Sequence, residues 1–326
     1  MIGERAIDDL AALTIATGGE GGIEAAFVPA AGMVGCSLRH RGEELLGQRD
    51  GLRAYAAEGG TMGIPLLYPW ANRVARMRFE VAGREVVLDR NSPRLAVDPN
   101  GLPIHGLLAA ASGWAVERHE STDGGGALAA RFDFGAHEEL LGAFPFPHEL
   151  LFEAALTGTT LTIATAVRAS GDTAVPIAFG YHPYLRLPGI DRAGWEVSIP
   201  VRERLRLDDL MLPTGEREPV EVEPGPLGSR TFDDGYVAPP DSAPFVLAGA
   251  GRRIEVSLGQ GYPYAQVYAP DDDDVIAYEP MTAPTNALVE GGPVLPLVAP
   301  GEECRATFSI TVIEDREWIA ASRSAT

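Results

Sequence analysis

The sequence predicts an all-β protein, a large and mostly antiparallel β-sandwich, from two observations. Short segments rich in Val, Ile, Phe and Thr recur along the whole chain, each bounded by Gly, Pro, Asn or Asp. Glycine and proline, 38 and 26 of the 326 residues, are spread throughout, as expected where turns join many strands. We find no sustained 3.6-residue periodicity, which argues against a helical or doubly wound architecture.

The individual elements follow from these local patterns. Residues 79–89 and 148–170 each predict a hairpin, because an apolar run on either side is interrupted by turn residues. Gly124–Gly126 reads as another hairpin tip, and short helices are expected over 136–141 and 285–290. Further strand-like segments are 22–29, 126–134, 195–207, 252–259, 264–270, 274–280 and 303–313.

The chain is predicted to form one domain, residues 1–326. Strand-like segments continue on both sides of every candidate boundary, and no stretch has the composition of a linker. No repeat of 20–50 residues suggests a solenoid or a propeller. A single sandwich of this length is common among all-β proteins.

The net charge, the N-terminal segment and the cysteines limit the kinds of partner and the cellular compartment that are expected for this protein. A formal net charge of −20 repels phosphate backbones and anionic lipid, so nucleic-acid and membrane partners are not expected. The N-terminal segment lacks the basic residues and the unbroken apolar run of a signal peptide, which predicts a cytoplasmic protein. Cys36 and Cys304 have no metal-binding spacing and are expected to be buried free thiols.

A run of four aspartates and a single glutamate lie close together near the C-terminus. Asp271–Asp274 falls between two strand-like segments and lacks the alternating ligands and glycine of a calcium loop, so it is interpreted as a solvated turn. Glu279 instead follows the apolar run Val275–Tyr278, at the end of an expected buried strand. A carboxylate in that position is costly unless it is paired or used, which makes Glu279 the better candidate for chemistry.

Other polar residues stand in similarly apolar surroundings. His105 lies in GLPIHGLL and His182 in IAFGYHPYLRL, and Arg73 follows the apolar run GIPLLYPW. Together with Asn72, Asp233 and Glu279 they supply both donors and acceptors, as sugar hydroxyls require. Aromatic rings such as Trp70 or Tyr184 are expected to cover the apolar side of a sugar ring.

These motifs resemble the aldose 1-epimerase (galactose mutarotase) family. The stretch WANRVARMRFEVAGREVVL, then IHG, GYHPYLRL, FDDGY and AYEP, is similar to the family's motifs in order and rough spacing over residues 60–315. The resemblance implies the galactose mutarotase-like supersandwich and interconversion of hexose anomers without a cofactor or a metal. The sequence departs from the family pattern at Tyr181, at Pro183–Leu185 and at Met281, where the family commonly has Asn, Thr-Tyr-Phe and Gln.

The resemblance also implies a role for each matching residue. Glu279 would be the general base and His182 the general acid, with His105 assisting at the ring oxygen or a hydroxyl. Asn72, Arg73 and Asp233 would hold sugar hydroxyls.

Three alternatives stay open from the sequence. A mutarotase of hexose 6-phosphates would need clustered arginines, for which Arg76, Arg78 and the run Arg39–Arg41 are available. A sugar-binding protein without catalysis would retain the aromatic residues and Arg73. A metal enzyme would use His105, His182 and Glu279 as a facial triad.

Overall fold

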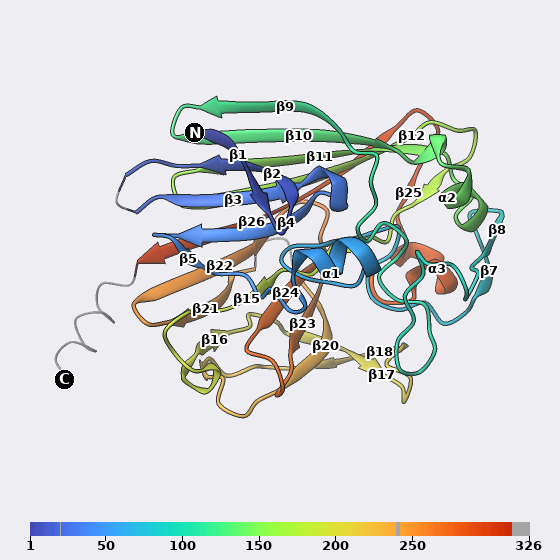
Figure 1. Ribbon diagram of the computed structural model, residues 1–326. Coiled ribbons are helices and arrows are strands. Elements are labelled where there is room, and N and C mark those ends of the chain that lie inside the picture. The colour runs from blue at the N-terminus through green and yellow to red at the C-terminus, as the bar shows by residue number, and fades with distance from the viewer. Residues whose placement is uncertain (20, 239–241, 315–326) are drawn as a thin grey trace.

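The computed structural model describes residues 1–19, 21–238 and 242–314, and its regular secondary structure is mainly antiparallel sheet (Figure 1). The first sheet has five strands in chain order. They are β1 (Ile2–Ile7), β2 (Leu10–Ala16), β3 (Ile23–Val28), β4 (Val34–His40) and β5 (Glu43–Glu44).

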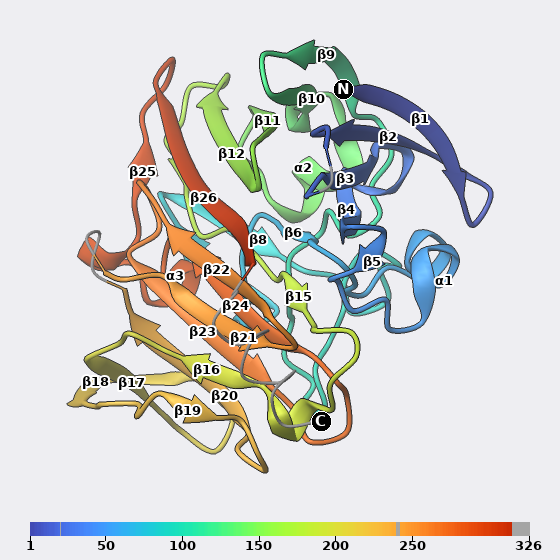
Figure 2. The ribbon, with the colours of Figure 1, turned by 90° about the vertical axis from the view of Figure 1, so that its left-hand side faces the viewer.

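A second sheet has nine strands, and a third sheet, of eight strands, packs against part of it (Figure 2). The nine strands run in the spatial order β19 (Gly225–Pro226), β16 (Glu196–Ser198), β21 (Phe245–Gly249), β22 (Arg252–Leu258), β26 (Glu303–Glu314), β12 (Thr160–Ala169), β11 (His148–Thr157), β10 (Gly125–Asp133) and β9 (Ala115–Thr122). The other sheet has β18 (Pro213–Pro219), β17 (Glu203–Leu207), β20 (Phe232–Val237), β23 (Tyr264–Ala269), β24 (Ile276–Met281), β14 (Gly180–Tyr181) and β6 (Leu66–Leu67), with β15 (Tyr184–Leu185) also pairing β24.

The remaining elements are short. Two further strand pairs are β7 (Arg78–Val81) with β8 (Arg84–Val87) and β13 (Val175–Pro176) with β25 (Leu297–Val298). The α-helices are α1 (Gly51–Glu58), α2 (Glu138–Ala143) and α3 (Ala287–Glu290), and the 3₁₀ turns are η1 (Pro29–Ala31), η2 (Phe134–Ala136), η3 (Arg192–Gly194) and η4 (Gly292–Val294).

The core lies between the nine-stranded sheet and the two sheets that pack on it (Figure 2). Phe27 of β3 meets Phe152 of β11 with ring centroids 5.4 Å apart, which joins the five-stranded sheet to the nine-stranded one. Phe245 of β21 meets Tyr278 of β24 at 5.3 Å, which joins the eight-stranded sheet to the same layer. The strand β11 alternates buried with more exposed residues, as the two-residue period of a strand requires.

The predicted all-β sandwich is therefore confirmed, together with several of its turns. The hairpins β7–β8 and β11–β12 form as expected, and Asp271–Asp274 connects β23 to β24. Of the predicted hairpin tip, Gly124 lies in the turn whereas Gly125 and Gly126 already belong to β10. The helices α2 and α3 overlap the predicted ranges, but α1 was not expected, because eight residues with only Leu52 and Tyr55 buried show too little periodicity.

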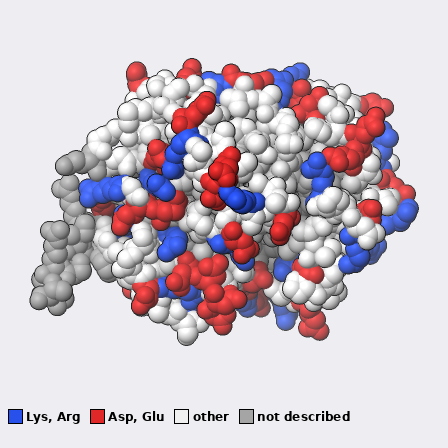
Figure 3. Space-filling model, viewed as in Figure 1, with Lys and Arg blue, Asp and Glu red and all other residues white. Residues whose placement is uncertain are grey.

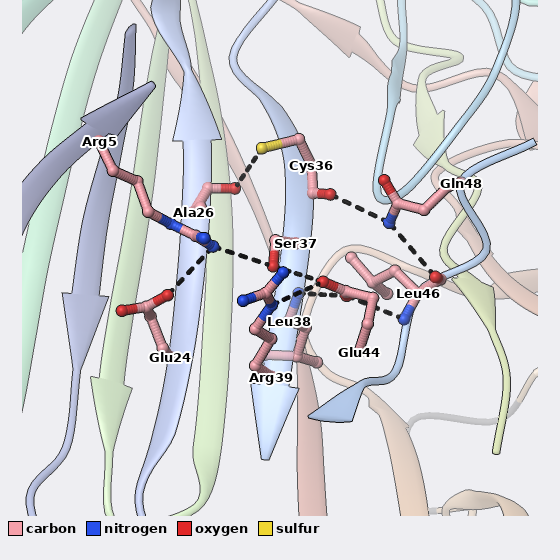
Figure 4. Close-up of polar contacts among 10 residues, drawn as sticks. All are labelled: Arg5, Glu24, Ala26, Cys36, Ser37, Leu38, Arg39, Glu44, Leu46 and Gln48. Carbon is pink, nitrogen blue, oxygen red and sulfur yellow. Dashed lines mark hydrogen bonds and ion pairs between the residues drawn. The ribbon is translucent and has the colours of Figure 1, made fainter. Parts of the chain in front are cut away.

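Both cysteines are free, and Cys36 lies in the network of polar contacts shown in Figure 4. Its Sγ donates to the Ala26 carbonyl oxygen at 3.5 Å, and burial raises the pKa of this thiol to about 12. It is therefore a protonated, unreactive side chain at neutral pH. Cys304 is only half-buried, so the expectation of two buried thiols is right for Cys36 alone.

The face of the molecule seen in Figure 3 carries acidic and basic side chains side by side, with acidic residues gathered along its lower edge. None of the helices in the described ranges is long and apolar enough to cross a membrane.

Candidate functional site

The segment that follows β6 carries the first pair of candidate residues, Asn72 and Arg73. Backbone hydrogen bonds hold it in place, from the Ala71 N–H to the Ala178 carbonyl oxygen and from the Asn286 N–H to that of Arg73. The guanidinium of Arg73 donates through Nε to Asp98 Oδ2 and through Nη1 to Asn72 Oδ1, both at 2.8 Å. Its Nη2 lies 3.8 Å from Oδ2 of Asp233 on β20. Arg73 thus connects three of the polar side chains around it.

His105 reaches the same place from the long connection between β8 and β9. Its N–H donates to the Asn72 carbonyl oxygen at 2.9 Å, and its backbone adopts a left-handed conformation with φ of 62°. The next residue, Gly106, has φ of +76°, and a Cβ there would lie 2.1 Å from the Tyr68 carbonyl oxygen. Glycine is required at this close approach, which explains why a His-Gly pair stands here.

His182 and Glu279 meet in the buried part of the cluster. His182 lies between β14 and β15, and its backbone N–H donates to the Pro65 carbonyl oxygen. Glu279 is a residue of β24, and the imidazole Nε2 of His182 lies 3.2 Å from its Oε1. Both side chains are at most 5% exposed. The predicted acid and base are therefore in direct contact.

Burial shifts the proton affinities of these groups in opposite directions. Burial, reinforced by the nearby Asp233 carboxylate, raises the pKa of Glu279 well above its usual value. Burial, reinforced by His105 and by the cation of Arg49, lowers the pKa of His182 well below its usual value. Burial and then Arg73 lower the pKa of His105 to about 3, so that this imidazole is neutral at physiological pH.

The cluster contains polar atoms that the protein itself leaves unsatisfied. Glu279 Oε2, His105 Nδ1 and His182 Nδ1 are buried and have no hydrogen-bond partner within the described residues. Buried polar atoms are normally paired, so three such atoms in one cluster make it a candidate site for a polar ligand. Asp233, whose side chain is 38% exposed, lies at the solvent side of the cluster.

The two predicted aromatic platforms are placed differently from the expectation. Trp70 is 1% exposed and belongs to the hydrophobic core. Tyr184 is 2% exposed, and its ring stacks on His182 with centroids 4.2 Å apart. Because Trp70 is packed within the core and His182 covers one face of the Tyr184 ring, their positions do not support the prediction that they cover a sugar.

Three residues of the cluster were not identified from the sequence: Asp98, Gln266 and Tyr268. Gln266 lies opposite Glu279 in the β23–β24 ladder and donates to Asp233 Oδ1 at 2.7 Å. Tyr268 lies opposite Asp233 and is only partly buried, so it is the better-placed aromatic residue. Strand alternation in YAQVYA puts Gln266 and Tyr268 on one face, which was the available signal. Asp98 comes from a loop without such a signal.

The described residues contain no group of three or more His, Cys, Asp or Glu side chains arranged to hold a metal ion. What the cluster offers is a set of donors and acceptors around the His182–Glu279 contact. The His105 ring meets that of His182 edge-on, Asp233 and Arg73 are close enough to Glu279 to shift its pKa, and Asp233 accepts a hydrogen bond from Gln266.

Comparisons with known proteins identify the family of this chain. The family model of aldose 1-epimerase matches residues 31–311. The Escherichia coli K12 protein YphB is 27% identical over 265 residues, which cover 78% of this chain and 83% of that protein.

Solved structures share the fold at lower sequence identity. A galactose mutarotase-like protein from Clostridium acetobutylicum has a TM-score of 0.83 at 18% identity, covering 96% of this chain and 98% of its own. A galactose 1-epimerase from Lactobacillus acidophilus NCFM has a TM-score of 0.73 at 14% identity, with coverage of 96% and 98%. Since the family model matches most of the chain, this protein belongs to the aldose 1-epimerase family.

Proposed function

We propose that this protein is an aldose 1-epimerase, a mutarotase that interconverts the α and β anomers of a hexose. The observation that carries the proposal is the contact of 3.2 Å between Nε2 of His182 and Oε1 of Glu279, next to the unsatisfied atoms described above. Mutarotation moves one proton off the anomeric hydroxyl and one onto the ring oxygen. Both of these oxygens are bonded to C1, so the base and the acid must be neighbours.

The proton transfers balance when Glu279 and His182 together carry one proton, which starts on His182 and ends on Glu279. The Glu279 carboxylate takes the proton of the anomeric hydroxyl while the His182 imidazolium gives its proton to the ring oxygen, and the bond from C1 to the ring oxygen breaks. Rotation about C1–C2 in the open-chain aldehyde presents the other carbonyl face, and the reverse transfers close the ring.

The pKa shifts favour the ring-opening direction of this transfer. A raised pKa for Glu279 and a lowered pKa for His182 stabilise the protonated carboxyl and the neutral imidazole, which are the products of that step. In the free protein the proton then rests on Glu279 and passes to His182 across their contact before the ring opens. Each positioned group typically contributes about 10²–10⁴-fold in rate.

The remaining residues are proposed to bind the sugar. Arg73 and Asn72, with Asp233, would hold hydroxyls, and charge-assisted hydrogen bonds of this kind contribute about 1.5–3 kcal/mol each. His105, neutral at physiological pH, would donate or accept a hydrogen bond at the ring oxygen or a neighbouring hydroxyl. Tyr268 replaces Trp70 and Tyr184 as the proposed aromatic contact.

Three of the four arginines considered for a 6-phosphate are paired with carboxylates, which favours a free sugar. Arg78 pairs with Glu85, Arg39 with Glu44 and Arg41 with Glu314 (Figure 4 shows Arg39 with Glu44). The fourth, Arg76, is exposed and stays a candidate for a phosphate contact.

Polarimetry tests the proposal directly. Freshly dissolved α-anomers of glucose and galactose, and their 6-phosphates, are followed to equilibrium with and without the protein. We expect acceleration of the free hexoses. Faster equilibration of the phosphates alone would replace the substrate class, and binding of hexoses without any acceleration would favour the sugar-binding alternative.

A further inference from the structure

The imidazole of His182 is enclosed by three rings. Tyr184 stacks on it with centroids 4.2 Å apart and planes inclined by 17°. Tyr268 and His105 approach it edge-on, at 5.6 and 5.7 Å. The Nε2 edge meets Glu279. The ring therefore has little freedom to turn about its own axis without striking a neighbour.

A catalytic imidazole is usually oriented in another way. One ring nitrogen commonly donates to a carboxylate or a backbone carbonyl, and that bond sets the direction of the other nitrogen. His182 Nδ1 has no such partner in the part of the chain that the structure describes. Aromatic packing must then do the orienting, and the stacked Tyr184 contributes the closest contact between rings.

Tyr184 is itself fixed at its hydroxyl and at its backbone. The hydroxyl oxygen lies 2.6 Å from Thr61 Oγ1 and accepts a hydrogen bond from Arg49 Nη1 at 3.3 Å. The Tyr184 N–H donates to the Gly63 carbonyl oxygen, and its own carbonyl accepts from the Gly47 N–H, both at 2.8 Å. The segments that carry Thr61 and Arg49 thus also hold the Tyr184 backbone.

These two segments are joined to each other and to the first sheet. The Gly63 N–H donates to the Gly47 carbonyl oxygen at 3.1 Å. Gln48 Nε2 donates to the carbonyl oxygens of Cys36 and Leu46, which anchors the chain directly before Arg49 (Figure 4). The hydroxyl of Tyr184 is therefore held from a framework outside the catalytic cluster.

We propose that Tyr184 is the positioning residue of His182, and that Thr61 and Arg49 hold the Tyr184 hydroxyl so that the stacked ring fixes the imidazole against Glu279. The inference rests on the proposed function, in which His182 is the acid. It gives Tyr184 a role through His182 instead of a contact with the sugar. Misalignment of the acid weakens proton transfer, whereas the residues that bind the sugar hydroxyls are untouched.

Thr61 offers the matched pair of variants. Thr61→Val keeps the shape of the side chain and removes the hydroxyl, whereas Thr61→Ser keeps the hydroxyl. We expect Thr61→Val and Tyr184→Phe to lower kcat about threefold to tenfold, the range that loss of one hydrogen bond gives, with KM unchanged within about twofold. Thr61→Ser should retain the wild-type kcat. An unchanged kcat in both Thr61→Val and Tyr184→Phe would overturn the proposal, as would an equal loss in Thr61→Ser.

Arg49 adds a charge as well as a hydrogen bond, and a pH profile separates the two. The groups that face His182 are Glu279 on β24, His105, Tyr268 on β23, Tyr184 on β15 and the Arg49 guanidinium. Removing the cation in Arg49→Met favours protonated states of the pair, so both limbs of the kcat profile should move to higher pH. Arg49→Lys keeps the charge and should leave the limbs in place while kcat falls. A wild-type kcat in both Arg49→Met and Arg49→Lys would show that Arg49 does not hold Tyr184.

A readout independent of activity separates failure of this inference from failure of the proposed function. Imidazole ¹⁵N NMR follows His182, assigned by its loss in His182→Gln, because the chain has 6 histidines. We expect Thr61→Val and Tyr184→Phe to broaden or shift this signal and Thr61→Ser to preserve it. Unaltered signals in all three would refute the positioning role, even if every sugar proved inert and the proposed function failed.

Discussion

Glu279 and His182, which come from distant segments of the chain, meet with Oε1 3.2 Å from Nε2 in a buried position next to Arg73 and His105. The strand β24 supplies the carboxylate, and the connection between β14 and β15 supplies the imidazole. Because β14 and β15 both pair with β24, His182, which lies between them, is brought alongside it. The sheet pairing thus brings His182 and Glu279 into contact.

Replacing Glu279 by Gln should abolish turnover while leaving sugar binding nearly intact. The amide retains the shape and can still bond to His182, but it cannot take a proton at neutral pH. We expect the polarimetric rate to fall at least 10²–10⁴-fold, the typical contribution of a positioned base. Asp274→Asn, in the exposed turn before β24, is the control and should keep the wild-type rate. Normal rates in Glu279→Gln would defeat the assignment.

Replacing Arg73 by Ala should raise KM by about tenfold to a hundredfold, because charge-assisted hydrogen bonds worth about 1.5–3 kcal/mol are lost. The same change leaves Asp98, whose side chain is 2% exposed, without its guanidinium partner, so thermal stability should fall too. Arg78→Ala removes an exposed arginine and should change neither quantity. Steady-state kinetics and thermal unfolding check this, and an unchanged KM would take Arg73 out of the site.

Gly106 should not tolerate a side chain, in contrast to a glycine of nearly the same backbone conformation. Gly106→Ala forces a left-handed alanine, at about 1–2 kcal/mol, and places its Cβ 2.1 Å from the Tyr68 carbonyl oxygen. Gly83 has φ of +74°, and no atom lies within 4 Å of the position that a Cβ would take, so Gly83→Ala carries only the conformational cost. We expect a larger fall in Tm and a lower kcat for Gly106→Ala, since His105 is displaced. Equal effects in both variants would contradict the steric account.

His148 should make the fold sensitive to acid. It is fully buried, its Nε2 lies 2.6 Å from the Tyr68 hydroxyl and its Nδ1 donates to the Phe146 carbonyl oxygen. Burial lowers the pKa of His148 to about 4 from 6.5. Between these two pH values this histidine is protonated in the unfolded chain but stays neutral in the folded protein. The contribution of neutral His148 to the free energy of unfolding is fully present above pH 6.5 and falls by about 3 kcal/mol as the pH drops to about 4.

The variant His148→Gln isolates this contribution. It removes the titrating group, so its unfolding free energy should depend less on pH between 7 and 4 by about the same 3 kcal/mol. Urea denaturation of both proteins at several pH values measures this difference. Because both proteins contain His105 and His182, the effects of these two residues cancel in the comparison. Parallel pH dependences for the two proteins would show that His148 is not the source.

Much of the fold was predictable because strands are encoded locally. The two-residue alternation and the Gly, Pro and Asp turns marked β7, β8, β11, β12, β23 and β24 correctly. The order of strands within the sheets had no such signal, since β22 and β12 both pair with β26 from far away in sequence. Such pairings depend on long-range packing that a local pattern does not contain.

The sequence by itself determined which residues are the candidates for the proposed chemistry: a carboxylate after an apolar run, two histidines in apolar segments and an arginine beside them. Only the tertiary structure decided their partners. It buried Trp70 in the core, set Tyr184 under His182 and brought Gln266, Asp98 and Tyr268 into the cluster. The physical reason is that alternation along a strand assigns a side chain to one face of a sheet, whereas the distant segments that cover this face settle whether it meets solvent, a proton donor or a ring.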